Sequence, residues 1–230
     1  MNAQVKGRQG GFTLVEIAIV LVIIGLLLGG ILKGQEMITQ AKIKNVMADF
    51  SGISAAYHGY QDRYRAIPGD DPGANARWAA VGALPAATSG NGNGVVAGAY
   101  NSANAADESR LWWDHLRRAG FVSGNGTQQP FNALTGQIGV QTGDGQAAVG
   151  PTMLNAGGGN GFVGLIMCSA NLPDKIAIAV DTQMDDGASN LGTVRALLQA
   201  APNPAIGAAQ VATAAYAETS TNIYTLCRSL

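Results

Sequence analysis

The sequence has few charged residues and almost none of the side chains that usually carry catalysis. Charged residues make up 13% of the chain, the net charge is -1, and histidine occurs twice, as His58 and His115. Such a weak net charge offers no overall basic field of the kind that favours nucleic-acid binding, so we expect no nucleic-acid partner. Phosphate-loop, zinc-peptidase, serine-hydrolase and Cys-x-x-Cys motifs are absent too. We therefore predict that the protein is not an enzyme.

Cysteine is equally scarce. Cys168 and Cys227 are the only two, and both lie far from the N-terminus. If this part of the chain lies outside the cytoplasm, the pair predicts a disulfide; the alternative is two unrelated buried thiols. In the chain-entropy description, such a bridge would stabilise the fold by about 4 kcal/mol.

One uninterrupted apolar run stands near the N-terminus. Residues 12–32 read FTLVEIAIVLVIIGLLLGGIL, and Glu16 is the single charge among them. A helix of about 20 residues crosses the roughly 30 Å hydrocarbon core of a bilayer. Because Lys6 and Arg8 precede the run, the positive-inside rule places the N-terminus in the cytoplasm and the chain after residue 33 outside.

Three interpretations of this segment compete: a cleaved signal peptide, a plain transmembrane anchor, and an anchor whose leader is removed. The first two leave unexplained both the Gly10-Gly11 pair before the run and the carboxylate of Glu16 within it. A carboxylate inside a membrane segment costs about 2.5–3.5 kcal/mol and needs a positive partner. A cut before Phe12 would create an amino group that supplies one, on the same helix or on a neighbouring copy.

The stretch Gly11-Phe12-Thr13-Leu14-Val15-Glu16-Ile17 resembles the processing signature of type IV prepilins. In that signature the leader ends in glycine, and glutamate is the fifth mature residue. The resemblance implies that prepilin peptidase cuts after Gly11 and methylates the amine of Phe12. It also implies that Glu16 neutralises the N-terminus of an adjacent subunit in a filament.

The chain departs from this family at one position. Lys33 stands where the family often has proline, whose usual effect there is a kink in the helix. Glycine lowers helix propensity by about 1 kcal/mol, so nearby glycines are candidate points of local unwinding instead. These glycines are Gly29, Gly30 and Gly34.

The resemblance implies a structural subunit of a type IV pilus or of a type II secretion pseudopilus. Its partners would be other subunits, prepilin peptidase and the inner-membrane assembly machinery. It would be a single-pass inner-membrane protein, N-terminus inside, and then part of a periplasmic or extracellular filament. The alternative is a monomeric membrane-anchored binding or adhesion protein that uses its glycine- and asparagine-rich loops on a surface or ligand.

An amphipathic stripe continues the helix beyond the apolar run, with spacings of three and four residues. Its members are Ile43, Val46, Phe50, Ile53, Tyr57, Tyr60 and Tyr64. We expect this stripe to pack on the protein's own globular domain; a two-stranded coiled coil is the alternative. Its three tyrosines favour a sheet as the partner, because a sheet can satisfy their hydroxyl groups.

The remainder predicts an α+β fold, in which a C-terminal antiparallel sheet covers the long helix. A helix beginning at Asp107 or Ser109 should end at Gly120, and His115 within it is expected to be a surface or packing residue. A second helix is expected after Asn171, although alternating Ile176 and Ile178 leave a strand possible. The expected strands are 138–141, 162–168, 193–198 and 223–227.

The predicted organisation has four parts. Residues 1–11 form the leader, 12–33 the transmembrane and assembly helix, 34–67 its amphipathic continuation, and 68–230 the extracytoplasmic domain with the disulfide region.

Three aspartates close to Gly187 are the only candidate metal ligands. Asp181, Asp185 and Asp186 offer clustered oxygens of the kind that Ca²⁺ prefers, although Ca²⁺ takes about 6–8 such ligands. The secretion pseudopilins that the chain resembles include calcium-dependent members. The alternative is a capped, solvated turn that holds no metal, and no other cofactor is expected.

Overall fold

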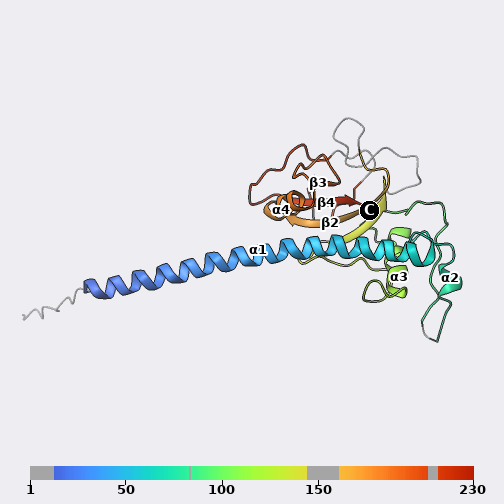
Figure 1. The fold of residues 1–230 in the computed structure, drawn as a ribbon, viewed down its shortest axis with the longest axis horizontal. Coiled ribbons are helices and arrows are strands. Elements are labelled where there is room, and N and C mark those ends of the chain that lie inside the picture. Colours follow the sequence, from blue (N-terminus) through green and yellow to red (C-terminus); the bar gives the residue numbers. More distant parts are fainter. Residues whose placement is uncertain (1–12, 83, 144–160, 207–211) are drawn as a thin grey trace, which may run out of the picture. The chain divides into compact units, whose positions relative to one another are not determined.

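The computed structural model describes residues 13–82, 84–143, 161–206 and 212–230. The chain divides into two compact units, residues 1–41 and 42–230. Figure 1 shows the elements in chain order, and the fold is α+β, as predicted. The elements are α1 (Leu14–Tyr64), α2 (Ala74–Arg77), α3 (Glu108–Arg118), β1 (Ile138–Thr142), β2 (Leu165–Pro173), α4 (Asp174–Met184), β3 (Val194–Leu198) and β4 (Ile223–Ser229).

Helix α1 is unbroken over 51 residues. It remains helical through Gly29, Gly30 and Gly34, so the expectation of local unwinding there was wrong. Each glycine lowers helix propensity by about 1 kcal/mol, but opening the helix would leave backbone groups unpaired among apolar side chains, which costs more. The apolar residues of the first unit are exposed, since this unit contains no other described element.

The second unit is built around an antiparallel sheet with the strand order β1-β2-β4-β3. Successive strand residues face opposite sides, so Met167 joins one core and its neighbours Ile166 and Cys168 join the other. Strand β2 begins later than predicted and continues to Pro173. Asn171, with φ of +58°, lies in an irregularity that lets the strand go on pairing with β4.

The second half of α1 packs against one face of this sheet, as its stripe of apolar residues predicted (Figure 1). Ile43, Val46 and Phe50 are buried with Val140 and Leu226 of the sheet. The stripe therefore belongs to the core of this chain, and the coiled-coil alternative is wrong.

The tyrosines at the end of the stripe contact other groups than the sheet that we expected. Tyr60 donates its hydroxyl hydrogen to Asp71 at 2.6 Å, and the ring of Tyr57 stacks on Trp112 of α3. The phenolic oxygen of Tyr57 accepts a hydrogen bond from Gln61 on the next turn of α1. The loop after α1 and α1 itself thus satisfy the hydroxyl groups of Tyr60 and Tyr57, while α3 packs on the Tyr57 ring. The prediction of a sheet partner was wrong for this part.

His115 of α3 is completely buried beneath the end of α1 and is a packing residue, as expected. Its Nδ1 accepts the backbone N–H of Gly69 at 2.9 Å, so the ring proton lies on Nε2 and is donated to the Thr88 carbonyl at 2.8 Å. Burial lowers the pKa of the imidazole, which favours this neutral form. Gly69 has a φ of +82°, and a Cβ there would collide with the backbone of Glu108.

Buried carboxylates fix the long connection between α1 and α3. Asp70 accepts backbone hydrogen bonds from Gly92, Asn93 and Gly94 at 2.6, 3.1 and 2.7 Å. Glu108 accepts two more, from the backbone of residues 91 and 97. A glycine-rich loop of this kind has little apolar surface to bury, so these charge-assisted bonds hold its shape instead.

The helix predicted after Asn171 is α4, which confirms the helical interpretation over the strand. The carboxylate of Asp174 at its start accepts hydrogen bonds from the backbone of Thr219 and Ser220. Ile176 and Val180 face the core. This contact with the sheet explains why the segment forms a helix, although its alternating isoleucine and alanine residues would also suit a strand.

Candidate functional site

The first turn of α1 contains a reciprocal pair of polar side chains, Thr13 and Glu16. The carboxylate oxygen Oε2 of Glu16 accepts hydrogen bonds from the backbone N–H of Thr13 at 2.7 Å and from its hydroxyl at 2.8 Å. The Glu16 N–H in turn donates to the Thr13 hydroxyl oxygen at 3.3 Å. This is a capping box, which satisfies backbone donors at the start of a helix. The Thr-x-x-Glu spacing could have revealed it from the sequence.

The capping box holds Glu16 at the beginning of an exposed apolar surface. Only one carboxylate oxygen takes part in it; Oε1 has no hydrogen bond to any residue that the structure describes. The large apolar side chains from Leu14 to Leu32 are between 46% and 86% exposed. Gly11 and Phe12 lie outside the described residues, so the expected cleavage site and amine are not placed.

The apolar part of α1 can cross a bilayer by its length and composition. None of its most apolar window is buried within the chain, unlike the core helix of a soluble protein. Such a surface is stable in water only when lipid or another apolar surface covers it. An apolar helix of this kind fits membrane anchoring.

The comparisons with known proteins agree with this geometry. Residues 6–32 match the family described as the prokaryotic N-terminal methylation motif. The chain thus carries an N-terminal methylation signal followed by an α+β domain. That signal is the prepilin-type signal of type IV pilins and pseudopilins, which confirms the resemblance found in the sequence. Neither the curated proteins nor the solved structures include a match.

Cys168 and Cys227 form a disulfide. The two residues are directly opposite each other on β2 and β4, the central strands of the sheet. Both are fully buried in the core on the face away from α1. The bridge therefore ties the last strand to the sheet.

The three aspartates of the candidate calcium site do come together at the end of α4. One oxygen of each of Asp181, Asp185 and Asp186 lies within 4.8 Å of the others. Asp181 is buried and accepts the Tyr216 hydroxyl at 2.5 Å, and Asp185 accepts the Val194 N–H at 2.9 Å. Burial raises the pKa of the Asp181 carboxyl, and the nearby Asp186 and Asp185 charges act in the same direction.

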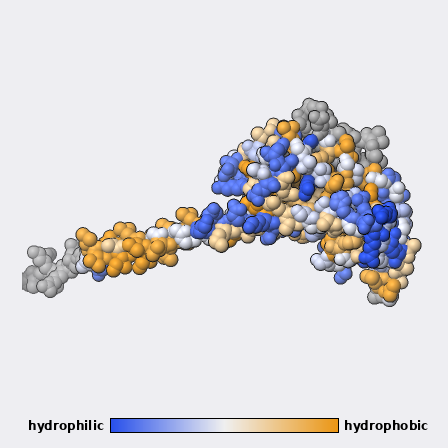
Figure 2. Space-filling view, in the orientation of Figure 1, coloured by the Kyte–Doolittle hydropathy of each residue, from blue (hydrophilic) through white to orange (hydrophobic). Residues whose placement is uncertain are grey.

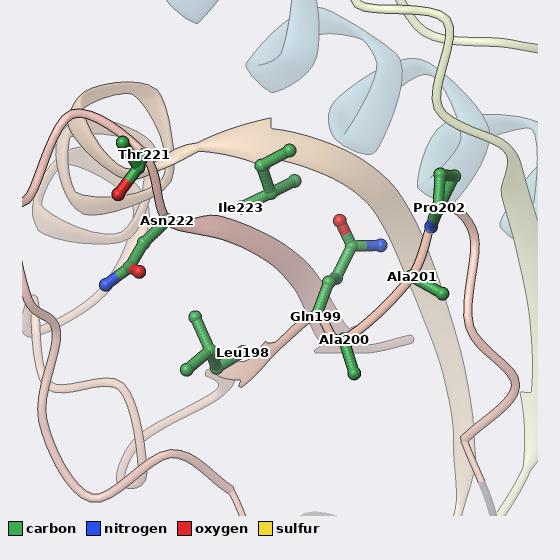
Figure 3. A pocket seen from close by; sticks show the side chains of 8 residues that line it. All are labelled: Leu198, Gln199, Ala200, Ala201, Pro202, Thr221, Asn222 and Ile223. Atoms are coloured by element: carbon green, nitrogen blue, oxygen red, sulfur yellow. The ribbon is translucent and has the colours of Figure 1, made fainter.

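A pocket of about 260 Å³ opens where β3 ends and β4 begins (Figure 3). Its lining residues are Leu198, Gln199, Ala200, Ala201, Pro202, Thr221, Asn222 and Ile223. None of them carries a charge or an imidazole, so the pocket offers neither a general base nor a set of metal ligands. The amide oxygen of Gln199 already accepts the Asn171 N–H at 3.2 Å.

Proposed function

We propose that this protein is a structural subunit of a type IV pilus or a type II secretion pseudopilus, polymerised through α1. The observation that carries this proposal is Glu16. It is the only charge in the apolar part of α1, it lies within the methylation motif, and its side chain is oriented by Thr13. A membrane anchor without a further role has no use for such a carboxylate.

Assembly would follow from the apolar surface of α1 and from its single carboxylate, Glu16. Prepilin peptidase cuts after Gly11 and methylates the new amine of Phe12. Apolar side chains then pack helix against helix, while Glu16 Oε1 accepts the amine of a neighbouring subunit. Because a buried charge without a partner is strongly unfavourable, this pair sets the axial register between subunits.

The four predicted parts of the chain have separate roles in this proposal. Residues 1–11 are a leader that remains on the cytoplasmic side, and residues 12–33 cross the inner membrane once. Residues 34–67 connect this segment to the domain at 68–230, which would lie outside the cytoplasm. The inner-membrane assembly machinery then moves the processed subunit into a periplasmic or extracellular filament.

The decisive experiment replaces Glu16 in the full chain. Glu16→Ala should still yield a processed chain beginning at methylated Phe12 by mass spectrometry, but no subunit in sheared filaments. Glu36→Ala is the matched control, because Glu36 is an exposed acid of the same helix beyond the apolar run, and it should leave assembly intact.

Two results would contradict the proposal. Filaments of Glu16→Ala in wild-type amount would show that the carboxylate does not set the register. A wild-type chain that stays monomeric in the membrane, with unchanged function in Glu16→Ala, would instead support the monomeric binding protein.

A further inference from the structure

A short apolar hairpin follows α2 in the second unit. Val81 and Leu84 close it, each donating its backbone N–H to the other's carbonyl, with N–O distances of 3.1 and 3.0 Å. The side chains of Val81 and Leu84 are 73% and 54% exposed. We use the name apolar tip for Ala79–Gly82 together with Leu84 and Pro85.

All six residues of the apolar tip are exposed, and none is polar. The sequence contains no charged residue from Trp78 to Ala106. Figure 2 shows hydrophobic surface over the loop after α2, beside strongly hydrophilic surface over α2 itself. A contiguous run of exposed apolar residues is uncommon on a folded domain, so the tip is a candidate interaction site.

The base of the apolar tip is fixed to the fold. Ala87 donates its N–H to the Trp78 carbonyl at 2.9 Å, and Arg118 donates to the Pro85 carbonyl at 3.0 Å. The Trp78 ring meets the Tyr64 ring edge-on, with 5.5 Å between their centroids. These contacts hold the base of the tip against the fold, which lowers the entropic cost of ordering it on binding.

Aromatic and cationic side chains gather at this base. The guanidinium groups of Arg77 and Arg63 lie over the Tyr64 ring, at 4.4 and 5.2 Å from its centroid. Arg65 lines the same surface depression as Arg77 and Tyr64. Three acids lie close to these three arginines: buried Asp71, which holds Arg77; Asp62, which is 3.5 Å from Arg65; and buried Asp70 in the same depression. The carboxylate of Asp70 is already bound by the backbone N–H groups of residues 92–94.

We propose that the apolar tip inserts into the headgroup and upper acyl region of a lipid bilayer that contains anionic lipid. Val81 and Leu84 can enter an apolar medium because their backbone groups are already paired with each other. Trp78 and Tyr64 then lie at the depth that amphipathic aromatic rings prefer, and Arg63 and Arg65 reach the phosphate groups. The succession of apolar tip, aromatic ring and arginine matches a bilayer more closely than the groove of a folded protein.

The test anchors the full chain through α1 in nanodiscs and adds separate vesicles of phosphatidylcholine, with or without phosphatidylglycerol. We expect the nanodisc-bound protein to float with the vesicles that contain phosphatidylglycerol. The double change Val81→Asp and Leu84→Asp should weaken this binding about tenfold or more, since two apolar side chains no longer enter the bilayer. Leu84→Phe should retain it.

Controls distinguish binding through the apolar tip from nonspecific hydrophobic binding and from unfolding of the variant. Phe131→Asp removes another large apolar residue, 61% exposed, and should leave flotation unchanged. Arg63→Gln with Arg65→Gln should remove the preference for phosphatidylglycerol. Flotation is interpreted only for variants whose melting temperature equals that of the wild type.

Three outcomes would overturn the lipid proposal. They are wild-type protein that does not float, an aspartate double variant that floats like wild type, and loss of flotation by Phe131→Asp to the same degree. If the aspartate variant instead fails only in filament assembly, the tip is a protein contact. Flotation is measured without filaments, so its outcome does not depend on whether the proposed function is correct.

Discussion

Thr13 and Glu16 hydrogen-bond to each other in both directions at the start of α1. This contact gives the carboxylate two protein donors at an otherwise apolar surface. The two residues are therefore best regarded as one unit, in which Thr13 orients the group that we propose to pair with the amine of another subunit.

Thr13→Val should lower filament yield without abolishing it, because it removes the hydroxyl bond but leaves the backbone N–H of residue 13 to hold the carboxylate. Thr13→Ser, which retains the hydroxyl, should assemble like wild type. The measurement is the amount of subunit in sheared filaments per amount of processed subunit. Equal yields for Val and Ser would show that the hydroxyl is unimportant.

Stability should fall as the pH drops below about 6.5, the ordinary pKa of histidine. Burial lowers the pKa of His115 in the folded protein, so the unfolded chain binds a proton there that the native chain does not. The stability present above pH 6.5 is thus lost progressively until the pH reaches the lower, folded pKa. Melting temperature against pH, for the full chain in detergent, measures this.

Two variants test the assignment of this pH dependence to His115. His115→Phe should reduce the fall in melting temperature below about pH 6.5. It should also lower the melting temperature at every pH, since Gly69 and Thr88 lose their hydrogen-bond partner. His58 is exposed on α1, so His58→Ala should reproduce the wild-type curve. A wild-type slope that survives in His115→Phe would assign the effect to other groups.

Asp70→Ala should destabilise the second unit by about 2–3 kcal/mol, because three backbone N–H groups lose a charged acceptor. Hydrogen exchange at residues 92–94 should increase most. Asp62→Ala is the control, since Asp62 is exposed, and it should change stability little. Unaltered exchange in Asp70→Ala would mean that the loop keeps its shape without this carboxylate.

Calcium should leave the melting temperature unchanged, since protein donors already hold Asp181 and Asp185 in place. The titration uses the full chain, with Mg²⁺ as a comparison. A rise with Ca²⁺ that is lost in Asp186→Asn would instead identify the three aspartates as a calcium site. Asp186 is chosen because its removal leaves the buried hydrogen bond between Asp181 and Tyr216 untouched.

The elements that follow a local pattern could be predicted from the sequence. Helix α1, strands β1, β3 and β4, and the α4 helix all depend on a hydrophobic period that neighbouring residues display. The methylation motif is local in the same way, because Glu16 stands out against an apolar run. The continuation of β2 could not be predicted, since it requires pairing with Ile223, which is remote in sequence.

The sequence by itself determined the apolar helix, its single carboxylate and the class of protein that such a helix indicates. Only the tertiary structure decided which partners surround the tyrosines, how His115 and Asp70 hold the connection after α1, and that Val81 and Leu84 remain exposed. The reason is physical: a residue type limits which bonds a side chain can form, whereas its actual partner and its burial depend on chain segments that only folding brings together.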